Sequence, residues 1–227
     1  MARDVLCDSG VLISLTAGCL DSLVRFFAEK YNVRFIIPPS VEYETVTRPL
    51  HSNLRKYLFS AIRIKDAIAD GVVVVVDAKI ETETRRLMNA ANNMFYIKGK
   101  PVRLIHYGES EVLALAKETG VETILIDERT TRLLIEGPFK LKGHLEKEFQ
   151  VNVMINKNSF RELAATVSSL DALRSSELVM LAYEKGYFKS FQKLQKEALE
   201  AALYKMKYAG CSISFEEITE YLSMVTK

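Results

Sequence analysis

Short runs of apolar residues, each ending at a polar residue or proline, recur along the first two thirds of the chain. They are continuous and do not alternate strictly with polar positions, so they predict strands that are covered on both faces. Between these runs, apolar residues recur at spacings of three and four, which indicates amphipathic helices around 20–27, 54–62 and from 108 onward. The predicted strands are 5–7, 33–37, 72–76, 123–126 and 151–155.

This alternation of strands and helices predicts βαβ units with right-handed crossovers and a mainly parallel sheet. Residues 1–155 are therefore expected to form one α/β domain. From residue 159 onward the strand signals vanish, and the chain is expected to form an all-helical C-terminal lobe over 156–227. The helices predicted there are 160–170, 177–185, 188–208 and 215–224.

Composition narrows the class of protein. The chain has 227 residues, of which 48% are hydrophobic and 26% charged, which excludes collagen-like and largely disordered proteins. A net charge of +2 neither demands nor excludes a nucleic-acid partner. Three cysteines without a CxxC pair argue against a disulfide framework and a structural zinc site. With no leader pattern and no apolar run of about 20 residues, we expect a cytoplasmic protein with no membrane partner.

Acidic residues follow several of the predicted strands. Asp8 ends the first strand, Asp127 ends the fourth, and Glu44 lies one to two helical turns beyond the second. The carboxyl ends of parallel strands share one edge of a sheet, so these acids are expected to converge. Each aspartate alone is also explained as a helix N-cap, and Glu42 is an alternative to Glu44.

A fourth segment adds two more acids, Glu109 and Glu111, in the first turn of a predicted helix, where the helix dipole favours acids in any case. Their spacing of two places them on different faces, so only one is expected to point into the cleft. Clustered carboxylates resist joint ionisation unless a cation lies among them. Oxygen ligands without paired His or Cys suit Mg²⁺ or Mn²⁺, a usual device for phosphodiester cleavage.

Four segments, taken together, resemble the motifs of the PIN-domain family of metal-dependent nucleases. They are 5–13 with Asp8-Ser9-Gly10, 39–44 ending in Glu44, 108–111 with the sequence Gly-Glu-Ser-Glu, and 125–132 from Leu125 to Arg132. They occur in the family's order. The likeness implies a three-layer α/β/α sandwich with a mainly parallel central sheet, and the helical tail is similar to the extension of some prokaryotic members.

The resemblance also implies a mechanism. Asp8, Glu44, Glu109 and Asp127 would hold one or two Mg²⁺ or Mn²⁺ ions, with Glu111 as the alternative to Glu109. Ser9 would position a ligand, and Arg132 would be the basic companion of Asp127. Single-stranded RNA would be cut by an activated water.

A basic and aromatic stretch precedes the third motif and suits a phosphate track, although a solvated loop explains it as well. Its basic residues are Lys98, Lys100 and Arg103. Two other functions stay open: a non-catalytic RNA-binding or assembly module, and a toxin neutralised by an antitoxin peptide. The helical tail leaves open a homodimer or a protein partner. Asp-x-Asp, Gly-x-Gly-x-x-Gly and P-loop patterns are absent, which argues against phosphatases and nucleotide-cofactor enzymes.

Overall fold

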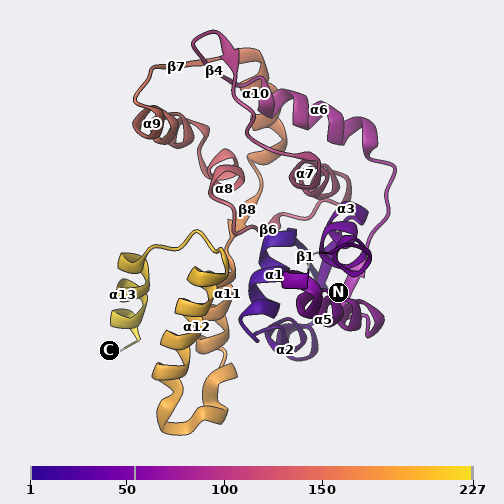
Figure 1. Cartoon of the computed structure of the whole chain (residues 1–227), viewed down its shortest axis with the longest axis vertical. Helices are drawn as coiled ribbons and strands as arrows, with labels where there is room; N and C mark the ends of the chain where they lie inside the picture. Colours follow the sequence, from indigo (N-terminus) through magenta and orange to yellow (C-terminus); the bar gives the residue numbers. More distant parts are fainter. Residues whose placement is uncertain (1, 54, 226–227) are drawn as a thin grey trace.

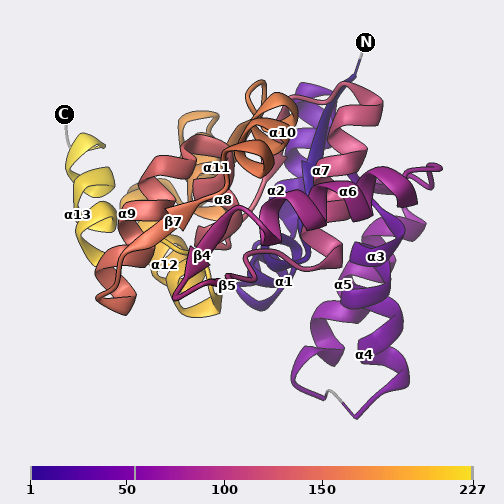
Figure 2. The same ribbon diagram turned by 90° about the horizontal axis from the view of Figure 1, so that it is seen from above.

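The computed structural model describes residues 2–53 and 55–225, and its centre is a five-stranded sheet in which every pair is parallel (Figures 1 and 2). The strand order is β3-β2-β1-β6-β8. β1 pairs on both sides, and its residues Leu6 and Cys7 are completely buried. The strands are β1 (Arg3–Cys7), β2 (Val33–Ile37), β3 (Val73–Val75), β6 (Thr123–Leu125) and β8 (Asp171–Leu173).

Helices cover both faces of this sheet. From β1 the chain adds β2 and then β3 toward one edge of the sheet, and it then crosses back over the sheet to add β6 and β8 toward the other edge. Because parallel crossovers are right-handed, the two directions place their helices on opposite faces. One layer holds α1 (Ser9–Ala17), α2 (Ser22–Tyr31) and α5 (Leu58–Ala69); the other holds α6 (Glu81–Asn92), α7 (Tyr107–Thr119) and α10 (Lys157–Val167). The α/β class with a parallel sheet is thereby confirmed.

A second, three-stranded sheet lies outside the parallel one. In it β4 (Phe95–Ile97) pairs antiparallel with β5 (Lys100–Pro101) and with β7 (Val153–Ile155). The strand predicted at 151–155 therefore forms, but the expectation that it belongs to the parallel sheet was wrong. The connection from β6 to β7 contains α8 (Arg129–Glu136) and α9 (Pro138–Phe149).

A chain of short helices follows β2 and leads to α5. It comprises α3 (Pro39–Glu42), the π-helix η1 (Tyr43–Thr47), α4 (Arg48–His51) and the 3₁₀-helix η2 (Arg55–Tyr57). The helix predicted at 54–62 is confirmed from Leu58 onward, while Leu54 lies outside the described residues.

The C-terminal third is mainly helical, as predicted, but it is not all-helical. Its helices are α11 (Ser175–Glu184), η3 (Tyr187–Leu194), α12 (Gln195–Ala209) and α13 (Phe215–Met224). The helix predicted over 188–208 is broken at Gln192, whose φ is 51°. The expectation of no strand after residue 159 was wrong, because β8 pairs with β6. Its sequence, Asp-Ala-Leu, has no β-branched or aromatic residue, so only the tertiary pairing makes it a strand.

The three cysteines are unpaired. Cys7 and Cys211 are buried, and burial raises the pKa of both thiols, so they pack as small apolar side chains. Among residues 2–53 and 55–225, no single helix has the length and apolar character to cross a membrane. Only α1 and α2 reach that length together, as a pair bent by 109°.

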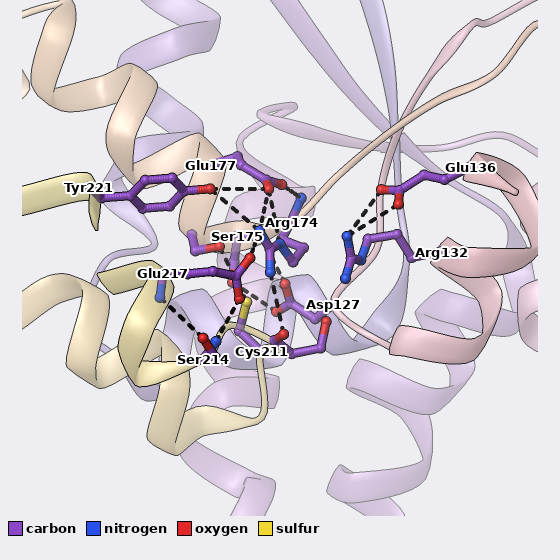
Figure 3. Close-up of polar contacts among 12 residues, drawn as sticks. Asp127, Arg132, Glu136, Arg174, Ser175, Glu177, Cys211, Ser214, Glu217 and Tyr221 are labelled. Carbon is purple, nitrogen blue, oxygen red and sulfur yellow. Dashed lines mark hydrogen bonds and ion pairs between the residues drawn. The ribbon is translucent and has the colours of Figure 1, made fainter. Parts of the chain in front are cut away.

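One buried arginine joins α13 to the rest of the fold (Figure 3). Arg174 is 3% exposed, and its guanidinium donates to Glu177 Oε1 at 3.0 and 2.6 Å and forms an ion pair with Glu217 Oε1 at 2.8 Å. It also donates to the Ser212 carbonyl at 3.3 Å. Burial alone would lower the pKa of Arg174, but its bonds to the two glutamates raise that pKa above its ordinary value.

This arrangement predicts that neutralising the two glutamates destabilises the fold more than removing the arginine does. The Glu177→Gln/Glu217→Gln double variant leaves a positive charge almost without solvent, so we expect its free energy of unfolding to fall by about 3–5 kcal/mol. Arg174→Met leaves two partly exposed carboxylates that water can reach, so its loss is expected to be smaller. Urea unfolding followed by circular dichroism measures both. The exposed pair variant Glu81→Gln is the control, and equal losses for the two changes would contradict this prediction.

Candidate functional site

The carboxyl edge of the parallel sheet brings the predicted acids into one region. Cys7 and Leu125 are register partners, and the Asp8 amide donates to the Leu125 carbonyl at 3.0 Å. Asp8 and Asp127 therefore leave neighbouring strands at almost the same level. β2 ends at Ile37 on the other side of β1, and α3 and η1 follow it directly.

Asp8 is at the centre of this region and is 6% exposed. Its Oδ2 accepts a hydrogen bond from the Gly10 amide at 3.0 Å, so it is the N-cap of α1. Burial is the main cause that raises the pKa of Asp8 to about 7, and the negative charges of Glu109 and Glu44 add to the rise. Hydrogen bonds from the Gly10 and Ser9 amides lower this pKa and so offset part of the increase. The cap explanation is thus confirmed, and three carboxylates from separate segments lie close enough to interact.

Glu44 and Glu109 come from opposite walls of one cleft. A Cβ atom at Gly108 would lie 3.3 Å from Glu44 Oε1, so the missing side chain leaves space for this carboxylate beside the first turn of α7. Glu109 is half-buried, and its Oε2 accepts from the His106 amide at 2.9 Å. The first turn of α7 therefore holds Glu109 through a hydrogen bond and leaves space for the carboxylate of Glu44.

Glu111 faces a different way, as the spacing of two predicted. It is 8% exposed, and its Oε2 accepts from the Ser40 amide at 2.9 Å, at the start of α3. Glu111 thus links α7 to the segment that carries Glu44. Glu42, the alternative to Glu44, accepts from Thr47 Oγ1 at 2.9 Å.

A cleft of about 500 Å³ opens beside Glu44 and Glu109. Both walls mix acids with basic and aromatic side chains. Arg103, predicted as a phosphate contact, lines the cleft; Lys98 and Lys100 are exposed on the β4–β5 hairpin and are not part of its lining. The lining also includes basic and aromatic residues that the sequence did not single out as site residues: Tyr43, Arg48, His106 and Tyr107.

Asp127 lies next to Asp8, yet its carboxylate is already engaged (Figure 3). It is 2% exposed, Oδ1 accepts from the Ser175 amide and Oδ2 from Ser175 Oγ, both at 2.8 Å. A Cβ atom at Gly10 would lie 3.8 Å from Asp127 Cβ and 3.2 Å from Asp8 Oδ2. Asp127 therefore holds the start of α11 against the sheet edge, and no sequence signal connects residues 48 positions apart.

The remaining predicted contacts lie at two other places. Ser9 is the first residue of α1, half-buried, and its amide lowers the pKa of Asp8. Arg132 forms an ion pair with Glu136 at 3.1 Å, and its charge helps to lower the pKa of Glu217 after Arg174. Arg132 thus belongs to the surroundings of the Arg174 cluster in Figure 3, away from the cleft lining.

Glu44 and Glu109 line the cleft, whereas Asp8 lies beside it, outside the lining. Together the three acids are chemically suited to a hard divalent cation. Asp8, Glu44 and Glu109 offer carboxylate oxygens whose mutual repulsion a cation would relieve. In the described part of the chain, no three His, Cys, Asp or Glu side chains form a ready-made ligand set, so the acids would have to draw together around an ion.

Comparison with protein-family models, with curated proteins and with solved structures found no match for this chain.

The raised pKa of Asp8 predicts a pH-dependent effect on stability. The folded chain holds this proton up to about pH 7, whereas the unfolded chain loses it near pH 4, so ionised Asp8 destabilises the fold as pH rises between these values. Asn at position 8 keeps the acceptor for the Gly10 amide without the charge. In EDTA, we expect Asp8→Asn to melt at a higher temperature than wild type at pH 8, and at the same temperature near pH 4.

Thermal unfolding by circular dichroism across this range makes the measurement. Asp77→Asn, at an exposed acid beyond β3, is the matched control. A melting difference for Asp8→Asn that does not change with pH would contradict the crowding of carboxylates.

The contact of Asp127 with Ser175 predicts a loss of stability. Asp127→Ala removes the acceptor of a buried amide and a buried hydroxyl, so the free energy of unfolding should fall by about 2–3 kcal/mol. Asp127→Asn keeps one acceptor and should lose less. A double-mutant cycle with Ser175→Ala, followed by urea unfolding, should give a coupling of about 1 kcal/mol, and strict additivity would show that the two side chains do not interact.

Proposed function

We propose that the chain is a PIN-like, metal-dependent ribonuclease that hydrolyses phosphodiester bonds of single-stranded RNA. The observation that carries the proposal is the meeting of Asp8, Glu44 and Glu109, from three separate segments, at the carboxyl edge of a parallel sheet. In open α/β sheets, this edge is where ligands bind. The neighbouring cleft supplies basic side chains for a phosphate.

Each side chain has a distinct task in this proposal. Asp8 is fixed by the first turn of α1, and Glu109 by its bond to the His106 amide, so two of the three acids are held before any ligand arrives. Glu44 is exposed and approaches from η1, so it is free to adjust. Mg²⁺ or Mn²⁺ bound among these oxygens would lower the pKa of a water and offset charge on the scissile phosphate.

Arg48 and Arg103 line the cleft with Glu44 and Glu109 and would pair with the phosphate oxygens. The acids alone would repel a polyanion, so a nucleic acid fits this cleft only where the arginines or a cation balance them. Asp127 supports the site indirectly in this proposal, because it fixes α11 beside the Asp8 turn. The sequence also predicted that Asp127 binds the metal directly; nothing tests that prediction, and the proposal does not include it, because Ser175 donates to both carboxylate oxygens.

The engagement of Asp127 favours one alternative, a non-catalytic RNA-binding module that keeps the acids for helix caps. Such a module would bind RNA equally well in EDTA and would cut none. The nuclease requires the acids to act on a cation, and that difference separates the two functions.

Cleavage of an end-labelled single-stranded RNA in Mn²⁺, Mg²⁺ and EDTA tests the proposal. We expect cutting in Mn²⁺ or Mg²⁺ only, and a loss of at least about 100-fold in Glu44→Gln and Glu109→Gln, because each removes charge that holds the cation. Glu42→Gln and Glu118→Gln, acids on the same segments but outside the cleft lining, should keep wild-type rates. A folded wild type that binds RNA in EDTA and cuts nothing in either metal would establish the binding module instead.

A further inference from the structure

The π-helix η1 and the first residue of α4 place three chemically different side chains in the lining of the cleft. The wide turn of η1 is closed by the Arg48 amide, which donates to the Tyr43 carbonyl five residues earlier. Residues five apart therefore share a face, and Tyr43, Glu44 and Arg48 all line the cleft. Single π-turns are rare and frequently occur at functional sites.

Tyr43 contributes little to the packing of the fold. Its side chain is 54% exposed, and within 2–53 and 55–225 its ring contacts no other ring and its hydroxyl makes no hydrogen bond. Across the cleft, Tyr107 is 37% exposed. A large aromatic ring that is left in solvent at the rim of a cleft presents a free face to a ligand.

Arg48 and Arg103 are similarly unengaged. In the described part of the chain neither guanidinium forms an ion pair, although Glu44 and Glu109 line the same cleft. Other exposed arginines of this protein do pair, for example Arg34 with Asp4 and Arg85 with Glu81. The two cleft arginines are therefore available to an anionic ligand.

An exposed aromatic face, an unpaired guanidinium and a carboxylate that line one cleft match one nucleotide of a single strand. The base stacks on the ring, the phosphate pairs with the guanidinium, and the carboxylate stays on the side of the cation. An acidic peptide would satisfy the arginines but would leave the ring without a planar partner.

We propose that Tyr43 and Arg48 form a nucleotide-binding subsite next to Glu44, in which Tyr43 stacks on an unpaired base of RNA and Arg48 holds the adjoining phosphate. The subsite rests on the proposed ribonuclease function and fixes the position of the strand relative to the acids. Stacking does not distinguish base identities, so the subsite sets the register of the strand and leaves its sequence unread.

The chain contains no tryptophan, which allows a direct test. The Tyr43→Trp variant carries the sole indole of the protein at the subsite, and we expect saturating ten-nucleotide single-stranded RNA to quench its emission in EDTA, where no cleavage occurs. Phe149→Trp is the control, because Phe149 is 52% exposed on α9, which lies far from α3 in Figures 1 and 2, and its emission should not change.

Fluorescence anisotropy with labelled RNA gives affinity independently of the indole. Tyr43→Ala should weaken binding by about 5- to 100-fold, and Tyr43→Phe should retain it because the ring remains. Arg48→Ala should reduce the salt dependence of binding by about one phosphate contact, whereas the exposed control Arg161→Ala on α10 should not.

The outcomes separate the subsite from the ribonuclease function. RNA that binds and is cut by wild type, but leaves Tyr43→Trp emission and Tyr43→Ala affinity unchanged, overturns the subsite and leaves the function standing. A wild type that neither binds nor cuts single-stranded RNA overturns both. The subsite is established if RNA quenches the emission of Tyr43→Trp but not of Phe149→Trp, and if Tyr43→Ala and Arg48→Ala show the changes in binding given above.

Discussion

The burial of one carboxylate beside two others is the constraint on which the candidate site depends. Asp8 lies in the middle of the parallel sheet edge because β1 pairs with both β2 and β6. Burial and the charges of Glu109 and Glu44 raise the pKa of Asp8 to about 7. A fold whose only requirement was a cap for α1 would be better served by Asn or Ser, which cap equally well without repulsion. A cation bound beside Asp8, as in the proposed function, would relieve this repulsion.

The other two acids of the same edge show a different use of carboxylates. Asp127 accepts both the amide and the hydroxyl of Ser175, and Glu111 accepts the Ser40 amide. Each holds the first turn of a helix from a distant part of the sequence, α11 and α3 respectively. Asp8 and Glu109 also accept amides, those of Gly10 and His106, but each does so within the first turn of its own helix. The distinguishing feature of Asp8, Glu109 and Glu44 is that the charges of the two glutamates act on Asp8.

Much of this arrangement follows from the sequence. Strand ends at Asp8 and Asp127 predicted their proximity, and the spacing of Glu109 and Glu111 predicted that they face different ways. The direction of the Asp127 side chain was not predictable, since Ser175 is 48 residues away. β8 was missed because Asp-Ala-Leu has weak strand propensity. The positions of Tyr43 and Arg48 in the cleft lining were missed because no periodicity predicts a π-turn. Local patterns therefore located the acids, and tertiary contacts decided what each one binds.

Binding of Mn²⁺, followed by electron paramagnetic resonance of the free ion, tests most directly whether Asp8, Glu44 and Glu109 form the metal site. The wild type, Glu109→Gln and Asp127→Asn are titrated at pH 8, where Asp8 is ionised. If the three acids hold the ion, Glu109→Gln weakens binding by about tenfold or more, while Asp127→Asn stays within about twofold of wild type. Unchanged binding in Glu109→Gln, or loss of binding in Asp127→Asn with the fold intact, would contradict this division of the acids.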